Sequence, residues 1–494
     1  MAWSVHSLNF MKTMKLLSVL FIGLLIGLFP PCGGPALGDP GSGAGEVREL
    51  LKRINDFRAE PVKMLKAMGY DPAALEANFP GTGGILEEGL PGFRHSGNLD
   101  LAAEKRADGL LEWIVTGDGA EEKPLEDRYQ AAGYFFRSGQ EAEAVIAFAN
   151  YMSPEAAAEL FFRDLVSREV APSEEKSWVL LSRDLEDAGA SFRQGTAVVG
   201  GRIANVYAVV LSLGSGLAPE EEMFFLRMNQ ARQAPEETAR SLGIETAGPY
   251  AAFPPGGLDT LLYSPRLAGT ARSHGLDMLR RGYFSTVTPE GETVEERIAA
   301  AGYSPDGAAE SLALRFHHDQ EPDAVEAGES LFRKAFWDEW NSSAPAGAAG
   351  VFLGSALSEA GFAFVAGFSE EFQDLCPFCG GDVTVLVADG ASREGVPGSF
   401  FMAALYEDGD GDGLYGMGEG IPGVNVLIAG PSGEERAFVS GPGGLVTFPV
   451  EGPGVHRVGL LDREGLDGAR EVEVMDKNVL LFIPLDEEPV GVPQ

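Results

Sequence analysis

Apolar residues follow two different periods along the chain, and the change of period divides it. Between residues 46 and 370, segments with apolar residues at helical spacing alternate with strand-like runs. Strand-like runs close both halves of this region, at TAVVGGRIANVYAVVLSLG (196–214) and GFAFVAGF (361–368). Helices that flank an antiparallel sheet satisfy this order, so the pattern predicts α+β domains.

The strand period takes over in the last quarter of the chain. SFFMAALYE (399–407) is rich in β-forming and aromatic residues, and Val424, Val426 and Ile428 alternate with other residues at the strand period. The predicted fold class is therefore multidomain, with two α+β domains and a C-terminal all-β domain. The predicted segments are a signal peptide (1–38), a first α+β domain (46–214), a second (219–370), a linker (371–382), an all-β domain (383–486) and a tail (487–494).

The region of α+β pattern repeats itself. Seven residues after the tyrosine of each AGY triplet stands a glutamate, Glu141 in the first half and Glu310 in the second. Two copies of one domain are the economical explanation. The matching segments are INDFRAEP (54–61) with MNQARQAP (228–235), LEDRYQAAGY (125–134) with VEERIAAAGY (294–303), FFRDLVSRE (161–169) with LFRKAFWDE (331–339), and LEDAGASF (185–192) with LSEAGFAF (357–364).

In the stretch EDGDGDGLYGMGEG (407–420), four carboxylates after Glu407 are crowded into one glycine-rich turn. Numbered from the first aspartate, they fall at positions 1, 3, 5 and 12, and the glycine at position 6, Gly413, permits a sharp bend. This spacing fits the calcium-loop pattern D-x-[DN]-x-[DN]-G-x5-E. Without a cation the charges would repel one another, and the alternative interpretation is a solvated acidic turn. The carboxylates are those of Asp408, Asp410, Asp412 and Glu419.

Calcium is therefore the cofactor that the sequence predicts. Ca²⁺ takes roughly six to eight oxygen ligands, which alternate residues of a tight turn can direct at one centre. The backbone carbonyl of Leu414 would be the ligand at position 7, and water would act for Gly416 at position 9. Glu419 would close the shell with both carboxylate oxygens.

The segments around this loop are strand-like, whereas an EF-hand has a helix on each side. A calcium loop between strands resembles the calcium-binding B-type repeats of bacterial surface adhesins, which are prealbumin-like β-sandwiches. The resemblance covers residues 383–486, including GEGIPGVNV (418–426) and GGLVTFPVEGPGVHRVGLL (443–461). It implies a β-sandwich in which the ion is structural and the domain serves as a spacer or adhesive module.

Charge narrows the classes of partner. The chain has 494 residues and a formal net charge of −37. Such acidity argues against nucleic acid, whose affinity for proteins comes largely from lysine and arginine on phosphates, and against anionic membrane surfaces. It suits an exported protein that handles divalent cations.

The N-terminal sequence predicts export. Two lysines precede an apolar run (16–29), the pattern of a signal peptide that starts at Met1 or Met11. The run is shorter than the roughly 20 residues that span a membrane, and no other long apolar run follows, so we expect no membrane span. A lipid anchor at Cys32 is an alternative, although Phe29 and two prolines before it are poor for a lipobox. The expected location is secreted, extracellular or periplasmic, with surface association as an option.

The other two cysteines, Cys376 and Cys379, form the motif CPFC just before the predicted all-β domain. A single CxxC is compatible with a redox pair, half of a zinc site or a local disulfide. Since no second CxxC and no βαβ pattern accompany it, a small disulfide in an oxidising compartment is the preferred interpretation.

The second copy resembles the CAP superfamily of cysteine-rich secretory, antigen 5 and pathogenesis-related proteins, in its bacterial secreted form. The similarity lies in HGLDMLRRGYFSTVTPEGETVEERIAAAGYSPDGAAESLAL (274–314), and the first copy is more distant. The resemblance implies two α-β-α sandwiches. The matching residues are Asp277, Met278, Phe284, Ser285, Pro289, Gly291, Arg297, Gly302, Tyr303 and Glu310 in the second copy, and Asn55, Arg58, Arg128, Gly133, Tyr134 and Glu141 in the first.

The metal site implied by this resemblance is incomplete. The family cleft usually holds two histidines and one or two glutamates around a metal, but Thr286 stands at one histidine position and NSSAPAG (341–347) lacks the other. Glu310, Glu141 and Thr286 remain as cleft candidates. The simpler interpretation is that each glutamate hydrogen-bonds to the backbone of its own domain. His274 is interpreted as a packed or exposed helix residue. His317 and His318, beside Asp319, form the best remaining ligand cluster, although neighbours in a strand point to opposite faces.

Two functions are therefore weighed, beside lipid or sterol carriage, which the resemblance implies as a third and for which these residues give no argument either way. One is an exported, non-catalytic binding or structural protein with degenerate CAP domains and a calcium-stabilised β-sandwich, whose partner is an unidentified protein, glycan or lipid. The other is a metal-dependent hydrolase that acts on peptides or cell-wall material through the CAP cleft, a reading that rests on resemblance alone.

Overall fold

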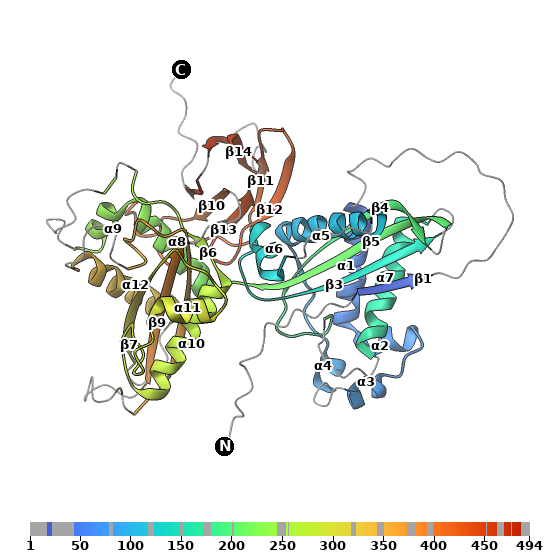
Figure 1. Ribbon diagram of the computed structural model, residues 1–494, viewed down its shortest axis with the longest axis horizontal. Helices are drawn as coiled ribbons and strands as arrows, with labels where there is room; N and C mark the ends of the chain where they lie inside the picture. Colours follow the sequence, from blue (N-terminus) through green and yellow to red (C-terminus); the bar gives the residue numbers. More distant parts are fainter. Residues whose placement is uncertain are drawn as a thin grey trace. The chain divides into compact units, whose positions relative to one another are not determined.

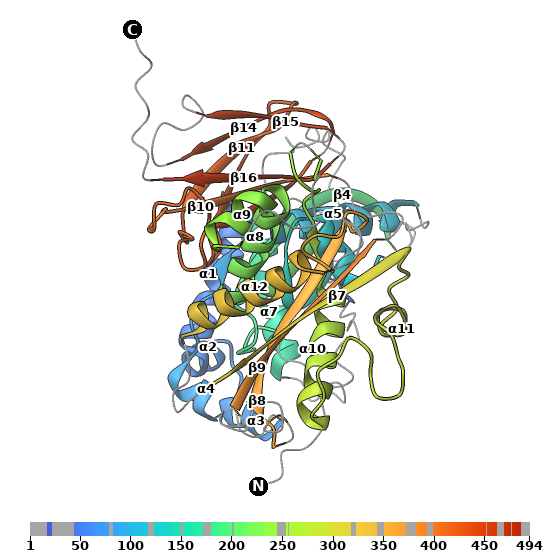
Figure 2. The same ribbon diagram turned by 90° about the vertical axis from the view of Figure 1, so that its left-hand side faces the viewer.

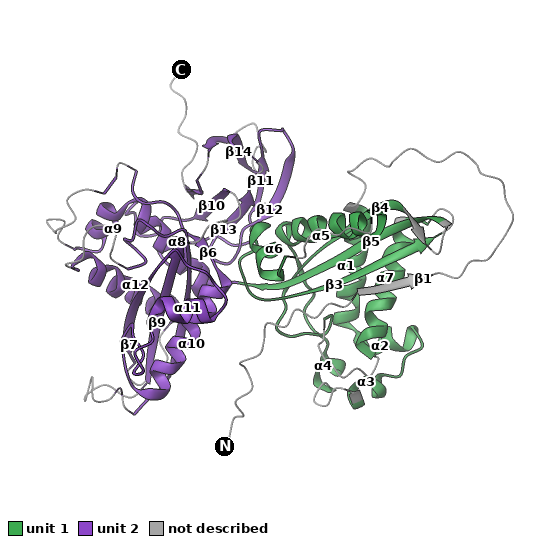
Figure 3. Ribbon diagram, viewed as in Figure 1, with its two compact units in different colours: residues 1–216 green, residues 217–494 purple. Residues whose placement is uncertain are grey.

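The protein forms two compact units, residues 1–216 and residues 217–494 (Figure 3). The computed structural model describes residues 17–21, 44–78, 83–116, 123–148, 152–170, 179–199, 202–244, 253–254, 256–317, 323–342, 350–370, 372, 382–392, 399–450, 452–461, 469–475 and 477–485.

The first unit is an α/β domain (Figure 1), called here the N-terminal domain (44–216), whose strands β3, β5, β4 and β2 pair in that order. Strand β1, which lies before the domain and within the predicted signal peptide, pairs parallel with the outer edge of β3. Helices α1 and α7 pack on one face of the sheet, and α5 packs on the other. The elements are β1 (Leu17–Phe21), α1 (Ala44–Ala59), α2 (Pro61–Ala67), α3 (Pro72–Asn78), α4 (Gly83–Glu88), β2 (Arg94–His95), α5 (Gly97–Thr116), α6 (Leu125–Ala131), β3 (Phe136–Phe148), α7 (Pro154–Val170), β4 (Asp187–Val199) and β5 (Arg202–Gly216).

The second unit begins with another α/β domain, called here the central domain (219–392), whose sheet has the order β6-β8-β9-β7. Figures 1 and 2 show α8 and α12 on one face of this sheet and α10 on the other. The elements are α8 (Pro219–Gln233), α9 (Pro235–Ser241), β6 (Leu262–Tyr263), α10 (Pro265–Arg281), α11 (Val294–Ala300), β7 (Gly307–Phe316), α12 (Ala324–Trp340), β8 (Glu359–Phe368) and β9 (Asp382–Ser392).

Strand β9 corrects the predicted domain boundary. It pairs antiparallel with both β7 and β8 over its whole length, so it lies inside the central sheet. The predicted linker (371–382) and the predicted start of the all-β domain at residue 383 are wrong at this point. The sequence did not indicate that β9 belongs to this sheet, because a long connection separates it from β8. In the N-terminal domain, β4 and β5 follow one another almost directly. Cys376 and Cys379 fall between the paired ends of β8 and β9 and outside the described residues, so the disulfide stays a prediction.

The second unit ends with strands in two sheets, of orders β13-β10-β16 and β12-β11-β14-β15, called here the C-terminal β-domain (399–485). The rings of Phe438 in one sheet and Phe448 in the other meet edge-to-face at 5.6 Å. An all-β C-terminal region was expected, and its described part contains strands and turns. The strands are β10 (Phe400–Tyr406), β11 (Asn425–Ala429), β12 (Glu435–Val439), β13 (Leu445–Pro449), β14 (Gly454–Leu460), β15 (Arg470–Val474) and β16 (Val479–Pro484).

Helix α8 is buried around its whole circumference between residues 221 and 232. One side packs on the central sheet, where the Phe224 ring lies 4.9 Å from that of Phe362. On another side the carboxylate of Glu222 accepts hydrogen bonds from the backbone N–H groups of Gly443 and Leu445 in the β-domain, both at 2.9 Å. A helix covered from two sides needs no polar outer face, which explains why apolar and polar residues mix along its sequence.

Candidate functional sites

Three groups of carboxylates in the described part of the chain can carry chemistry: one buried cluster in each α/β domain and the acidic loop of the β-domain. In the central domain, Glu310 projects from β7 with a fully buried side chain. Its Oε1 accepts a hydrogen bond from Arg297 Nη2 at 2.7 Å and lies 2.8 Å from His274 Nδ1. Burial raises the pKa of Glu310 to about 7, against the opposing charge of Arg297.

Asp389 is a second buried carboxylate that the sequence analysis missed. It stands directly opposite Glu310 in the register of β7 and β9, and it is fully buried. Its Oδ2 accepts a hydrogen bond of 2.5 Å from Thr270 Oγ1 on α10. Burial raises the pKa of Asp389 well above its usual value, and the neighbouring Glu310 charge adds to the effect. The sequence pattern does not indicate Asp389 as a partner of Glu310, because a long connection separates β9 from the other strands of its sheet.

His274 is a packed helix residue, one of the two alternatives expected for it. Its side chain is fully buried, and burial, aided by the Arg297 charge, lowers its pKa to about 4. The imidazole is therefore neutral at physiological pH. A neutral histidine leaves Arg297 as the one formal positive charge among the side chains that contact Glu310 within the described residues.

Thr286, the third cleft candidate, contacts this cluster through its backbone. Arg297 Nη1 donates to the carbonyl oxygens of Thr286 and Glu292, each at 3.1 Å. Thr286 itself is exposed, while Glu310 is buried. The guanidinium of Arg297 thus stands between the exposed loop 284–292 and the carboxylate, and the structure does not bring the Thr286 and Glu310 side chains together in one open cleft.

The N-terminal domain has a related cluster with a different balance of charge. Glu141 on β3 pairs through Oε2 with Arg128 Nη1 at 2.5 Å. Opposite it in the β3–β5 register stands Ser212, whose hydroxyl donates to Glu141 Oε1 at 3.0 Å. Burial raises the pKa of Glu141 and Arg128 opposes the shift. One carboxylate therefore faces one arginine and one neutral hydroxyl.

The two α/β domains also share contacts made by asparagine at matching positions. Asn55 brackets the backbone of Phe93, accepting from its N–H at 2.8 Å and donating to its carbonyl at 3.1 Å. Asn229 brackets Leu261 in the same way, at 2.8 and 3.2 Å. These asparagines fix the strand that precedes α5 or α10 to the opening helix of each domain.

A buried arginine and glutamate hold one loop in each domain. Arg58 donates to the carbonyl of Leu180 at 2.6 Å, and Glu169 accepts from the N–H of the same residue at 2.8 Å. In the central domain, Arg232 donates to the carbonyls of Val351, Phe352 and Gly354. There Glu339 takes the part of Glu169: it accepts from the N–H groups of Val351, Phe352 and Leu353.

The residual histidine cluster is only partly visible. His317 Nε2 lies 2.7 Å from the hydroxyl of Thr384 on β9. His318 and Asp319 fall outside the described residues. A metal at this cluster stays without structural support, because the histidine that is described already has a hydroxyl partner.

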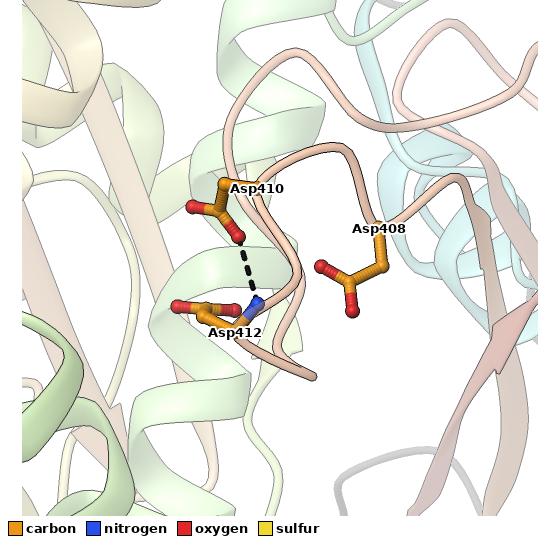
Figure 4. Close-up of side chains that lie close together, drawn as sticks. All are labelled: Asp408, Asp410 and Asp412. Carbon is orange, nitrogen blue, oxygen red and sulfur yellow. Dashed lines mark hydrogen bonds between the residues drawn. The ribbon is translucent and has the colours of Figure 1, made fainter.

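The acidic loop brings its three aspartates together. Each of Asp408, Asp410 and Asp412 has a carboxylate oxygen within 4.8 Å of the others (Figure 4). Asp408 accepts from the N–H groups of Gly411 at 2.9 Å and Gly413 at 3.1 Å, so the chain wraps around its carboxylate. Gly413 has φ of 76°, the left-handed conformation that the pattern requires of a glycine at position 6.

Glu419 closes the same loop. Its two oxygens accept from the N–H groups of Gly409 at 2.8 Å and Gly416 at 2.6 Å. An antiparallel bridge between Tyr406 and Gly420 joins the ends of the loop. The candidate ligands are carboxylates and a backbone carbonyl, a set of hard oxygens that fits Ca²⁺ and gives no preference for zinc. The side chains of Asp408, Asp410, Asp412 and Glu419 with the carbonyl of Leu414 would hold the ion.

The acidic loop is tied to the central domain. The carbonyl of Tyr415 accepts a hydrogen bond of 3.0 Å from Arg227 on α8. Gly418 donates to the sulfur of Met223 at 3.0 Å. Met417 packs so closely on α12 that a Cβ added at Gly328 would lie 2.4 Å from its terminal methyl. The loop therefore connects two strands of the β-domain and also contacts two helices of the central domain.

Comparison with known proteins gives only remote likenesses. No family model and no curated protein matches the chain. Among solved structures, it is similar to Na-ASP-1 at 12% identity, over 73% of this chain and 93% of that one, with a TM-score of 0.22. An extracellular protein containing a SCP domain from Bacillus anthracis str. Ames is 12% identical, over 42% of this chain and 64% of that one, with a TM-score of 0.20.

The major pilin subunit of Bacillus cereus is a further structural neighbour, at 11% identity and a TM-score of 0.14, over 24% of this chain and 50% of that one. The chain thus spans half the length of the pilin and 64% of the SCP-domain protein. TM-scores this low carry no argument about fold or function. In the described part of the chain, no helix is long and apolar enough to cross a membrane.

Proposed function

We propose that this chain is an exported, non-catalytic binding or structural protein, made of two degenerate CAP-type domains and a calcium-stabilised β-domain. The observation that carries the proposal is the burial of Glu141 and Glu310. Each glutamate is enclosed and bonded to an arginine of its own domain, Arg128 or Arg297. A carboxylate in this state holds a loop in place, and it is not presented to a substrate or to an exchangeable metal.

The matched contacts support a common origin of the two α/β domains. The asparagine that brackets a strand and the arginine–glutamate pair that holds a loop occur in both domains, at matching positions of the sequence repeat. Two unrelated domains would not be expected to use the same residue types to bond corresponding backbone groups. The CAP assignment itself rests on the sequence resemblance.

The acidic loop supports the structural role of calcium. An ion held by the loop would neutralise the three clustered aspartates and fix the turn between β10 and β11. Because Tyr415 and Gly418 bond to α8, a fixed loop also stiffens the contact with the central domain. This arrangement suits a rigid spacer or adhesive module that carries the α/β domains.

The partner we propose is a protein, glycan or lipid met outside the cell or at its surface. The net charge of −37 makes nucleic acid a poor partner. The apolar N-terminal run supports export, as a signal peptide or, through Cys32, as a lipid anchor.

Thermal unfolding of the full chain in calcium and in chelator tests the calcium role. We expect the second unit to unfold at a higher temperature in calcium, because an ion that binds only the folded loop stabilises it. Asp410→Asn removes one ligand charge and is expected to abolish most of this shift. The matched control is Asp338→Asn, an exposed carboxylate on α12 outside the loop. Equal unfolding temperatures in calcium and chelator would contradict a calcium site.

A further inference from the structure

Three buried polar atoms of the central cluster have no partner among the described residues: His274 Nε2, Glu310 Oε2 and Asp389 Oδ1. All three side chains are fully or almost fully buried. An unpaired buried polar atom is costly, so three in one cluster indicate that something further binds there.

The chemistry of the pair identifies what is missing. Glu310 and Asp389 stand directly opposite each other in the register of β7 and β9, and each has one buried carboxylate oxygen without a partner among the described residues. Two ionised carboxylates can only accept, so they cannot bond to each other. If one of them carries a proton, that proton becomes the donor between them.

Charge balance gives the same answer independently. The groups that contact the pair are His274 and Thr270 from α10 and Arg297 from α11, while Asp277 and Glu292 act on His274. His274 is neutral, so Arg297 is the one cation in direct contact with the pair among the described residues. One arginine balances one carboxylate, and a second buried negative charge would be uncompensated.

We propose that Glu310 and Asp389 form a proton-binding site that holds one shared proton at neutral pH and, through Arg297, keeps loop 284–292 in place. Arg297 connects the two parts, because one nitrogen bonds Glu310 and another bonds the carbonyls of Thr286 and Glu292. Loss of the proton leaves two negative charges beside one guanidinium and draws Arg297 away from the loop carbonyls. Loop 284–292 carries the exposed apolar side chains of Phe284 and Val287, so the proton controls how this surface is presented.

The direction of the pH effect on stability depends on whether the folded or the unfolded chain binds the proton more tightly. The folded state holds the proton more tightly than the unfolded chain, since the pKa of Glu310 rises from 4.5 to about 7 on folding. Stability from this site is therefore fully present at low pH and is lost as pH rises through that range and above it.

The test is thermal unfolding of the full chain between about pH 5.5, above its isoelectric point, and about pH 8.5. In Asp389→Asn, a neutral amide takes the place of the protonated carboxyl. We expect this variant to unfold at a temperature at least about 3 °C above the parent at the alkaline end, with the gain shrinking toward the acid end. Asp382→Asn, an exposed carboxylate on the same strand, is the matched control and should follow the parent at every pH.

Two further measurements keep the outcome clear. Glu310→Gln supplies the neutral group from the other strand and should show the same pH-dependent gain. Hydrogen exchange of residues 284–297 should be faster in the parent than in Asp389→Asn at the alkaline end, and equal at the acid end. Parallel pH profiles for parent and Asp389→Asn, or variants less stable than the parent at every pH, would overturn the proposal.

Discussion

The N-terminal and central domains contain the same buried arginine–glutamate pair, but they differ in the residue that lies opposite the glutamate. In both, an arginine from α6 or α11 binds a glutamate on the first long strand of the sheet. The residue opposite that glutamate is Ser212 in one domain and Asp389 in the other. A hydroxyl donates and completes the cluster, whereas a carboxylate adds a second acceptor. The framework is thus repeated, while a second buried carboxylate opposite this glutamate is present in the central domain and replaced by a serine in the N-terminal domain.

The comparison separates what holds the domains together from what distinguishes them. Asn55 and Asn229, or Arg58 and Arg232, make the same contacts, so changes at paired positions should cost similar amounts. Changes at Ser212 and Asp389 should have opposite signs. The following variants test this division, from the largest expected effect to the smallest.

Removing the loop-holding arginine should cost most. Arg232→Met leaves the carbonyls of Val351, Phe352 and Gly354 without their donor in a buried loop. We expect a loss of at least about 3 kcal/mol in the unfolding free energy of the second unit. Arg58→Met should cost a similar amount in the first unit, whose arginine is 3% exposed. Calorimetry that resolves the two units measures this, and a loss confined to one variant would break the equivalence.

Replacing the loop-holding glutamate should cost less. Glu339→Gln and Glu169→Gln each replace one carboxylate oxygen with an NH2 group that cannot accept a hydrogen bond. We expect each variant to lose about 1–3 kcal/mol of unfolding free energy. Burial raises the pKa of both glutamates from 4.5 to about 7, so the stability they contribute declines as pH rises through that interval.

The glutamine variants should lose this decline, because an amide does not titrate. Urea unfolding at about pH 5.5 and about pH 8 checks both halves of the prediction. An unchanged slope with pH in either variant would show that its glutamate is ionised throughout.

Ser212→Asp gives the N-terminal cluster a second carboxylate opposite its glutamate, as in the central cluster. The new carboxylate faces Glu141, which already pairs with Arg128. We expect a loss of about 1–2 kcal/mol at alkaline pH and a smaller loss at acid pH, where the added group is protonated. Ser212→Asn, of similar size and without charge, is the control. Equal effects of Asp and Asn at all pH values would contradict the charge argument.

Removing the tyrosine hydroxyl of the AGY triplet should have the smallest effect. Tyr134 donates to Asp187 at 2.7 Å, and Tyr303 donates to Glu359. Tyr134→Phe and Tyr303→Phe should each lower the free energy of unfolding by about 1 kcal/mol, and the two losses should be similar. Denaturant unfolding measures both, and a difference of several-fold between them would indicate that the two clusters are built differently.

The sequence predicted the framework because its residues lie in locally readable segments. Paired motifs located the helices α1 and α8, the glutamates and the tyrosines, and the strand period located β10 and β11. The acidic spacing also brought together the aspartates that the structure places within 4.8 Å. Local spacing alone suffices for these features, since each lies within one element or one turn.

The rest depended on pairing between distant segments. Asp389 joined the site only because β9 returns to the sheet after a long connection, and sequence periodicity does not specify that partner. Helix α8 showed no polar outer face because the β-domain covers it, an effect of tertiary packing. The burial of Glu310 behind Arg297 likewise follows from α11 packing over β7, which local sequence spacing does not specify.

Elemental analysis of the full chain, after gel filtration in a calcium buffer and rapid desalting, tests the central claim most directly. The account predicts about one calcium per chain, held by the acidic loop, and no stoichiometric zinc or other transition metal. Stoichiometric transition metal that is lost in Glu310→Gln would contradict it, because the buried glutamate would then be a metal ligand and the hydrolase reading would replace the one proposed.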